Sequence, residues 1–407
     1  MTIQSLRTAS KIFLIAGAIF LLAFLVWVKA TTGSVVQENV VAAESAYHHA
    51  VIESATVVEG KDFSDDPTVA VGTVEVQMTL RLDDGQVVSS RGLDETGLYK
   101  AGRRVIVQYQ PGASAEFQWG VVDVERSGRL LWLTAVFALA VLALMGRQGV
   151  ASLIGLAFSI AMIVWIIAPA MLSGQNPLLV ATLGALAVMW VTLPMSHGFN
   201  WTTAAAMIGT AVALALTVLL TVVSVDGTFI TGLANEDARN LRYLIDGFQL
   251  DLRGILMAGI VIGTLGVLDD VTVSQASTVA QLRAAAPNAP RAKIVAGALK
   301  VGRDHLAASV NTLFLAYAGA SLPLLLLFAI GGVSLGEHLT SETVAQEIVR
   351  ALAGSIGLVA AVPITTILAA MILDEDSAVL HDHDHGEVHP EQERLVEMYG
   401  DNSDKTT

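Results

Sequence analysis

The residues best suited to chemistry are carboxylates at the ends of apolar segments. One stripe recurs at steps of four and three residues and joins glycines, one carboxylate and two hydroxyls: Gly259, Gly263, Gly266, Asp270, Ser274 and Ser277. On an α-helix these residues share one face, and glycine at this spacing lets a second helix approach closely. The pattern predicts a proton or cation site at Asp270. The alternative is that Asp270 only anchors the helix at the cytoplasmic boundary, and Asp269 is expected to point elsewhere, toward the interface.

A second carboxylate stands at the start of the next apolar segment. Asp304 and Asn311 are seven residues apart, so they share a helix face. If the two segments pack antiparallel, Asp270 and Asp304 lie near the same cytoplasmic entrance, where two carboxylates can share a proton. A structural ion pair of either carboxylate with Arg303 is the alternative interpretation.

Two prolines interrupt the last apolar segments. Pro323 and Pro363 each lie within a stretch that is otherwise suited to a helix. Broken helices expose carbonyl groups that bind ions near the middle of the membrane in some transporters. Most prolines in membrane helices only kink the helix, so these two are predicted hinge or packing positions.

The C-terminal tail alternates imidazole and carboxylate groups. His381, His383 and His385 are separated by single aspartates, a pattern that suits Zn²⁺ or Ni²⁺. The tail carries eleven acidic and two basic residues and lacks an apolar period, so we expect it to be disordered. The alternative is a solvated acidic tail that binds no divalent metal.

Composition excludes several classes of protein. Of 407 residues, 54% are hydrophobic and only 15% are charged, which favours a polytopic membrane protein over a soluble one. A net charge of −14 argues against nucleic acid as a partner. The absence of cysteine removes thiolate metal sites and cysteine nucleophiles. No catalytic motif or phosphate-binding loop is visible, so we expect neither an enzyme nor a cofactor.

The carboxylates must be positioned by membrane spans, of which the sequence predicts about eight. A span needs about 20 apolar residues, and the segments that qualify or nearly qualify are Ile12–Val28, Leu130–Met145, Val150–Leu172, Pro177–Pro194, Thr202–Ser224, Gly254–Asp270, Ala308–Gly331 and Ala351–Leu373. Eight Lys and Arg residues fall in one set of short loops and four in the other. The positive-inside rule therefore places both termini in the cytoplasm.

The first span has a second interpretation. Val28-Lys29-Ala30 loosely resembles a signal-peptide cleavage site, but the apolar run is long for a signal peptide and Lys29 is unfavourable there. An uncleaved anchor over residues 1–30 is therefore expected.

An extracytoplasmic domain is predicted between the first two spans, over residues 31–126. Five valine-rich runs indicate short strands, and Asp83-Asp84-Gly85 and Pro111-Gly112 indicate turns. This pattern favours a small all-β barrel of the OB type, with a sandwich as the alternative. Fifteen acidic and seven basic residues exclude an oligonucleotide-binding surface, so the expected contact is with protein, membrane or a small solute.

Three motifs in the remaining spans resemble the YibE/F family of multi-spanning membrane proteins. They are the run from Gly263 to Ser277; Gly302-Arg303-Asp304 with Asn311-Thr312-Leu313 and Ser321–Leu326; and Glu347–Arg350 with Gly354–Leu358 and Val362-Pro363. A weaker match joins Gly198-Phe199-Asn200 to Gly209-Thr210. The sequence departs from the family pattern at Asp269, where an apolar residue is expected, and at Trp201-Thr202, where a basic pair is common. The resemblance implies a permease over residues 127–373, followed by the tail at 374–407.

The leading hypothesis is a secondary transporter of an ion or small solute in the plasma membrane, coupled to protons or cations through Asp270. The alternative is a membrane sensor or scaffold that transports nothing and binds a partner through its extracytoplasmic domain. A homo-oligomer is compatible with both hypotheses.

Overall fold

The computed structural model describes residues 3–32, 47–58, 73–95, 97–114, 117–244, 250–330, 336 and 339–373. The chain forms two compact units, one of residues 33–150 and one of residues 1–32 and 151–407. The predicted metal ligands His381, His383 and His385 lie outside the described residues.

The first unit contains a five-stranded antiparallel sheet. Its strands are β1 (Tyr47–Val57), β2 (Val74–Leu82), β3 (Val87–Asp94), β4 (Arg104–Tyr109) and β5 (Trp119–Val124). Their order is β3-β2-β1-β4-β5, and the edge strands β3 and β5 contact each other, so the sheet curls into a half-barrel. Alternate side chains of β1, β2 and β4 form its core, including Ile52, Leu80 and Val105. The five predicted strands are confirmed, whereas the OB-type assignment stays a prediction.

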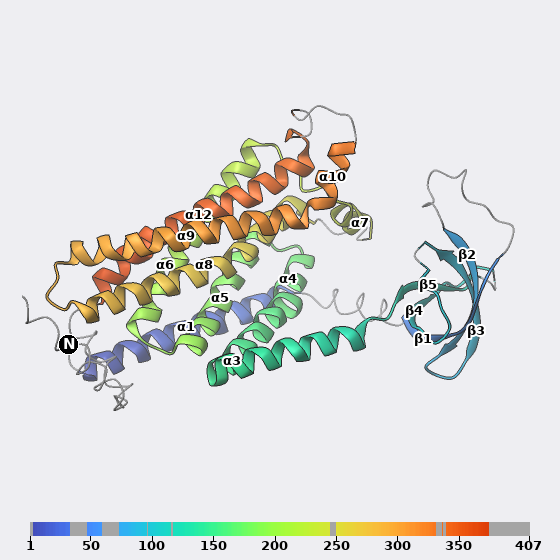
Figure 1. Cartoon of the computed structure of the whole chain (residues 1–407), viewed down its shortest axis with the longest axis horizontal. Coiled ribbons are helices and arrows are strands. Elements are labelled where there is room, and N and C mark those ends of the chain that lie inside the picture. The colour runs from blue at the N-terminus through green and yellow to red at the C-terminus, as the bar shows by residue number, and fades with distance from the viewer. Residues whose placement is uncertain are drawn as a thin grey trace, which may run out of the picture. The chain divides into compact units, whose positions relative to one another are not determined.

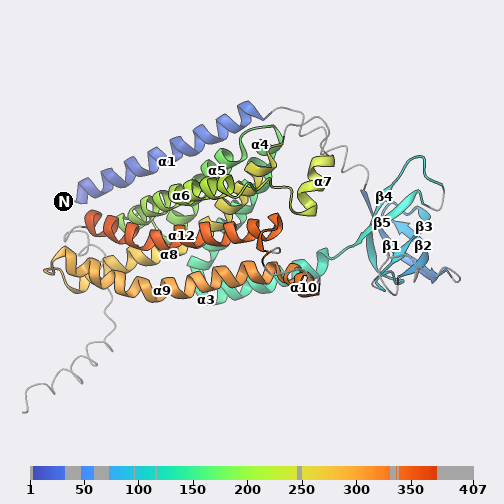
Figure 2. The same cartoon turned by 90° about the horizontal axis from the view of Figure 1, so that it is seen from above.

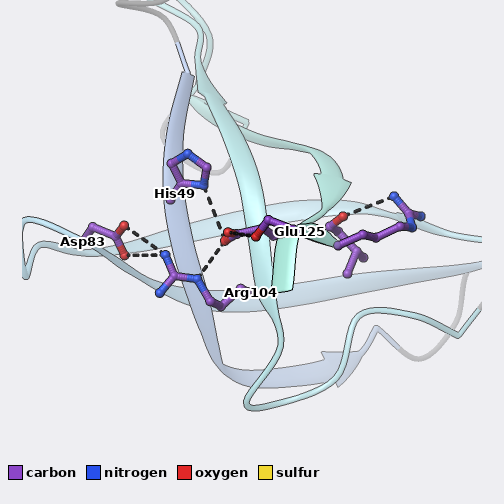
Figure 3. A network of polar contacts seen from close by, with 7 residues as sticks. His49, Asp83, Arg104 and Glu125 are labelled. Carbon is purple, nitrogen blue, oxygen red and sulfur yellow. Dashed lines mark hydrogen bonds and ion pairs between the residues drawn. The ribbon is translucent and has the colours of Figure 1, made fainter. Parts of the chain in front are cut away.

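A network of charges joins four parts of this sheet (Figure 3). The Arg104 guanidinium donates to Glu125 at 2.7 Å and to Asp83 at 3.0 Å. Glu125 also accepts from the Ser127 hydroxyl at 2.6 Å, and His49 Nδ1 lies 3.4 Å from its carboxylate. The hydrogen bonds from Arg104 and Ser127 lower the pKa of Glu125 to about 2. Because Ser127 begins the helix that follows, Glu125 ties the end of the sheet to that helix.

Helix α3 (Ser127–Met162) contains a sharp break. Gly146 has φ 53° and ψ −126°, a backbone conformation that favours glycine, so two helices meet there. The π-helix η1 (Ile163–Ile167) and α4 (Ala168–Leu172) continue the second part. The whole stretch Ser127–Leu172 has 46 residues, about 69 Å of helix at 1.5 Å per residue. Since a bilayer core is about 30 Å thick, two spans that turn at Gly146 fit it better than one.

The second unit is a bundle of long helices (Figure 1). They are α1 (Ile3–Thr31), α5 (Pro177–His197), α6 (Trp201–Gly227), α8 (Leu252–Ala285), α9 (Arg291–Ala320) and α12 (Glu342–Ile372). The shorter helices are α7 (Glu236–Leu244) and α10 (Leu322–Ile330). Helices α6, α8, α9 and α12 lie side by side in both views (Figure 2), and α12 packs against the other three.

Five helical stretches of the described chain are long and apolar enough to cross a membrane: Ser127–Leu172, α5, α6, α8 and α12. The apolar part of α1, Ala16–Thr31, is shorter. The predicted seventh span divides into α9 and α10 at Ser321, and Pro323 occupies the first turn of α10, where a proline is tolerated. The chain is a helical membrane protein, and the total of eight spans stays a prediction.

Candidate functional site

Helices α6, α8 and α12 enclose a line of buried polar side chains, which we call the polar seam. Helix α6 runs antiparallel to the other two, as the paired contacts along them require. Ten side chains make up the seam, and nearly all are buried: Thr210, Thr217 and Thr221 of α6; Thr264, Asp269, Thr272 and Gln275 of α8; Ser355, Thr365 and Thr366 of α12. Hydroxyl-rich interfaces of this kind hold membrane helices together through close contacts and hydrogen bonds.

Glycines on facing helices make room for the threonines of the seam. A Cβ added at Gly357 of α12 would lie 1.9 Å from the Thr217 hydroxyl. A Cβ at Gly209 of α6 would lie 2.2 Å from the Thr365 hydroxyl, and one at Gly354 would lie 3.0 Å from Thr264. These helices therefore approach each other where one side contributes only a hydrogen, and α12 is held against both α6 and α8.

The carboxyl group of Asp269 faces α6 in the part of the seam that contains Thr210 and Thr272. It interacts with the Thr210 hydroxyl, which lies 2.6 Å from the Thr272 hydroxyl. Thr272 in turn contacts the Asp269 carbonyl oxygen at 3.2 Å, and Thr210 contacts the Ala206 carbonyl oxygen at 3.1 Å. Asp269 Oδ1 is enclosed and has no hydrogen-bond partner in the described part of the chain.

Among the described residues, Asp269 Oδ1 has no donor because the two threonine hydroxyls have fewer hydrogens than the acceptors around them need. Each threonine hydroxyl has one hydrogen to donate, and the 2.6 Å contact between Thr210 and Thr272 uses one of the two. One hydrogen then remains for the carboxylate and for the carbonyls of Asp269 and Ala206. The cluster is therefore short of donors when Asp269 is ionised, and a bound proton or cation would supply what it lacks.

Gln275 closes the seam toward α9. Its amide nitrogen donates to the Ala298 carbonyl at 2.9 Å and to the Thr366 hydroxyl at 2.6 Å. Gly302 of α9 packs against it, since a Cβ at Gly302 would lie 2.6 Å from Gln275 Oε1. The Gln275 side chain thus joins α8, α9 and α12, six residues after Asp269 along α8.

Charged contacts flank the opposite end of the seam. Asp226 at the end of α6 pairs with Arg253 at the start of α8. Glu342, the first residue of α12, accepts hydrogen bonds from Thr231 N and Oγ1 at 2.8 Å and from Gly232 N at 3.0 Å. These contacts join the three seam helices where α6 ends and where α8 and α12 begin.

The part of the chain that contains the polar seam is similar to known proteins. A family model described as YibE/F-like protein matches residues 133–375, which is more than half of the chain and includes α5 to α12. The chain belongs to the YibE/F family. No curated protein and no solved structure matches it.

Within this YibE/F region the predicted stripe on α8 faces outward. Asp270 and Ser274 are exposed, Ser277 is half-buried, and a Cβ at Gly259 or Gly266 would meet no atom within 4 Å. Gly263 approaches only the Tyr317 hydroxyl, at 3.3 Å from an added Cβ. Helices α5, α6, α9 and α12 pack against other parts of α8, and close approach of a further helix to the stripe stays a prediction. The ion-binding role of Asp270 stays a prediction.

The other predicted polar residues are also apart from the seam. Asp304 and Asn311 are both exposed on α9. Pro363 lies inside α12 next to Thr365 and Thr366, and the helix continues through it to Ile372. The predicted pairing of Asp304 with Asp270 is not tested by these positions.

The spacing of residues along the sequence favours Asp270 over Asp269 and does not single out the threonines of the seam. Asp269 was expected at the interface, yet its carboxyl group is directed into the bundle. Two signals pointed to it: an acid where the family pattern has an apolar residue, and Thr210, Thr217 and Thr221 spaced along one face of α6.

Proposed function

We propose that this YibE/F protein is a permease, a secondary transporter whose coupling ion is bound at Asp269 in the polar seam. The observation that carries the proposal is the enclosed Asp269 Oδ1, which has no partner among the described residues. Placing an Asp within a membrane helix costs about 3 kcal/mol, and such residues usually mark ion or proton pathways. Because the sequence contains no phosphate-binding loop, the energy would come from an ion gradient or from a partner protein, and the proposal takes the ion gradient.

The position of Asp269 suits a coupling step better than that of Asp270. Asp269 contacts hydroxyls from α6 and from its own helix, so a change in its charge would act on the α6–α8 interface. Asp270 is exposed on the outer face of α8 and contacts neither. Transport requires such a link between charge and helix packing, because an ion can shift a conformational equilibrium only through differential contacts.

The test compares two neighbouring amides. Asp269→Asn and Asp270→Asn proteins are placed in liposomes, and currents are recorded after jumps in pH, Na⁺, phosphate, amino acids and divalent cations. We expect wild type to respond to at least one jump, Asp269→Asn to lose about tenfold or more, since a charged contact is removed, and Asp270→Asn to keep most of the current.

Two results would overturn the proposal. A wild-type protein that is folded and silent to every jump would favour the sensor or scaffold alternative. Equal currents in wild type and Asp269→Asn would remove Asp269 from the path, and a selective loss in Asp270→Asn would restore the outer stripe as the site.

A further inference from the structure

The polar seam extends well beyond Asp269, and its lining indicates what it carries. We infer that the seam takes a bare, singly charged cation, either H⁺ or Na⁺, and not an anion or an organic solute. This inference rests on the proposed transport function and names its substrate class. It also assigns a role to the buried hydroxyls of the seam other than Thr210 and Thr272, which the coupling step alone does not use.

The lining offers oxygen atoms with free lone pairs. Thr221, Ser355 and Thr365 have buried hydroxyl oxygens without a hydrogen-bond partner among the described residues. Thr217 and Thr264 donate to carbonyls of their own helices, so both keep lone pairs for the seam. Hydroxyl oxygen is a ligand for hard cations and a relay for protons.

These oxygens are spaced along most of a membrane leaflet. Thr221 and Thr210 are eleven residues apart on α6, about 16 Å along the helix axis. Thr217 lies between them. Thr264 of α8 packs against Gly354, three residues before the Gly357 that faces Thr217, and Thr365 of α12 packs against Gly209, next to Thr210. The seam thus supplies several successive oxygen sites between Thr221 and Asp269.

Close packing excludes a larger passenger. The Thr217 and Thr365 hydroxyls sit so near Gly357 and Gly209 that not even a methyl group fits on those glycines. Thr210 and Thr272 are in direct contact at 2.6 Å. An organic solute would need the helices to separate, whereas a dehydrated cation or a proton could pass with small movements of hydroxyls.

The charges around the seam favour a single positive charge. Asp269 is the one ionisable side chain among the ten seam residues, so one cation neutralises it. Asp226 pairs with Arg253 at one end of the seam. On α12, Glu347 pairs with Arg350. At the other end of α8, Arg283 donates to the carbonyls of Pro287 and Ala289. No basic side chain among the described residues of the seam is available to bind an anion.

The experiment measures binding in detergent and flux in liposomes with the full chain. Thermal stability is followed while NaCl replaces choline chloride at constant ionic strength, and while pH is lowered without Na⁺. Currents are driven by Na⁺, by pH or by phosphate gradients. The variants are Thr365→Val and Asp269→Asn, with Thr365→Ser as the variant that keeps the hydroxyl. Thr312→Val, at an exposed threonine of α9, is the matched control.

We expect stabilisation and current with Na⁺ or with protons alone, a loss of about tenfold or more in Asp269→Asn and Thr365→Val, and wild-type behaviour in Thr365→Ser and Thr312→Val. Dependence on Na⁺ at constant pH identifies Na⁺, and currents from pH jumps in its absence identify H⁺. Phosphate or organic-solute currents that survive both variants would overturn the inference and leave the transport function standing. Cation binding without any current would overturn the transport function and leave the inference.

Discussion

Two adjacent carboxylates on α8 illustrate how much one helical step decides. Asp269 and Asp270 are separated by about 100° around the helix axis. That rotation places Asp269 against the Thr210 hydroxyl of α6 and leaves Asp270 exposed. The glycine periodicity favoured Asp270, yet the side chain that the bundle encloses is Asp269.

Glu125 carries the first prediction at the residue scale, in the five-stranded sheet. Its hydrogen bonds from Arg104 and Ser127 lower its pKa from 4.5 to about 2. Because the folded value is depressed, this stabilisation is fully present above pH 4.5 and is lost as the pH falls toward 2. We expect Glu125→Gln to weaken β4 and β5 at neutral pH and to flatten their loss of stability between pH 4.5 and 2.

Hydrogen exchange of the β4 and β5 amides in the full chain, corrected for intrinsic rates, measures this effect. Glu95→Gln, at an exposed acid near the end of β3, is the control and should follow wild type. If the wild-type and Glu125→Gln amides lose protection in parallel as the pH falls, the network contributes nothing to the pH dependence.

At the scale of elements, α12 organises the bundle. It offers Gly354 and Gly357 to threonines of α8 and α6, and its own Thr365 fits against Gly209. Membrane helices gain no hydrophobic energy from leaving lipid, so such close contacts supply much of their association. The interlocked pattern explains why one helix contacts three neighbours along its length.

Gly357→Ala tests this packing. Its new methyl group would overlap the Thr217 hydroxyl, and overpacking of this kind costs about 1–3 kcal/mol. We expect a lower unfolding temperature in detergent and partial recovery in the double variant Gly357→Ala with Thr217→Ala, which removes the hydroxyl.

Gly266→Ala on the open face of α8 is the matched control. No atom lies within 4 Å of its added Cβ, and alanine favours a helix by up to about 1 kcal/mol over glycine. We expect no loss of stability. A clear loss at Gly266 would instead indicate a partner on that face, for which a second copy of the chain is the first candidate.

For the whole molecule, the prediction concerns orientation in the membrane. From the Lys and Arg distribution we expect both termini and the loop between α8 and α9 in the cytoplasm, with the five-stranded sheet outside. Reporter fusions after Gly60, Ala286 and Gly400 should report outside, inside and inside. The order inside, outside, outside would show that the protein has the opposite orientation in the membrane. Any other order would show that the number of spans differs from the predicted one.

The sequence by itself determined the parts of this protein that depend on local pattern. Apolar length located α5, α6, α8 and α12, alternation located the five strands, and the gap between the predicted spans Leu130–Met145 and Val150–Leu172 contains the break in α3 at Gly146. The motifs around Gly263, Asp304 and Gly354 identified the YibE/F family. These features follow from residues close together in the chain, so no knowledge of distant partners is needed.

Only the tertiary structure decided which face of each helix meets another helix. Periodicity states which residues share a face, such as Gly259, Gly266 and Asp270, but it does not state what covers that face. The partner of Asp269 is Thr210, 59 residues earlier, and that of Gly357 is Thr217, 140 residues earlier. Such pairs exist because packing brings distant segments into contact, and no local spacing in the sequence records that contact.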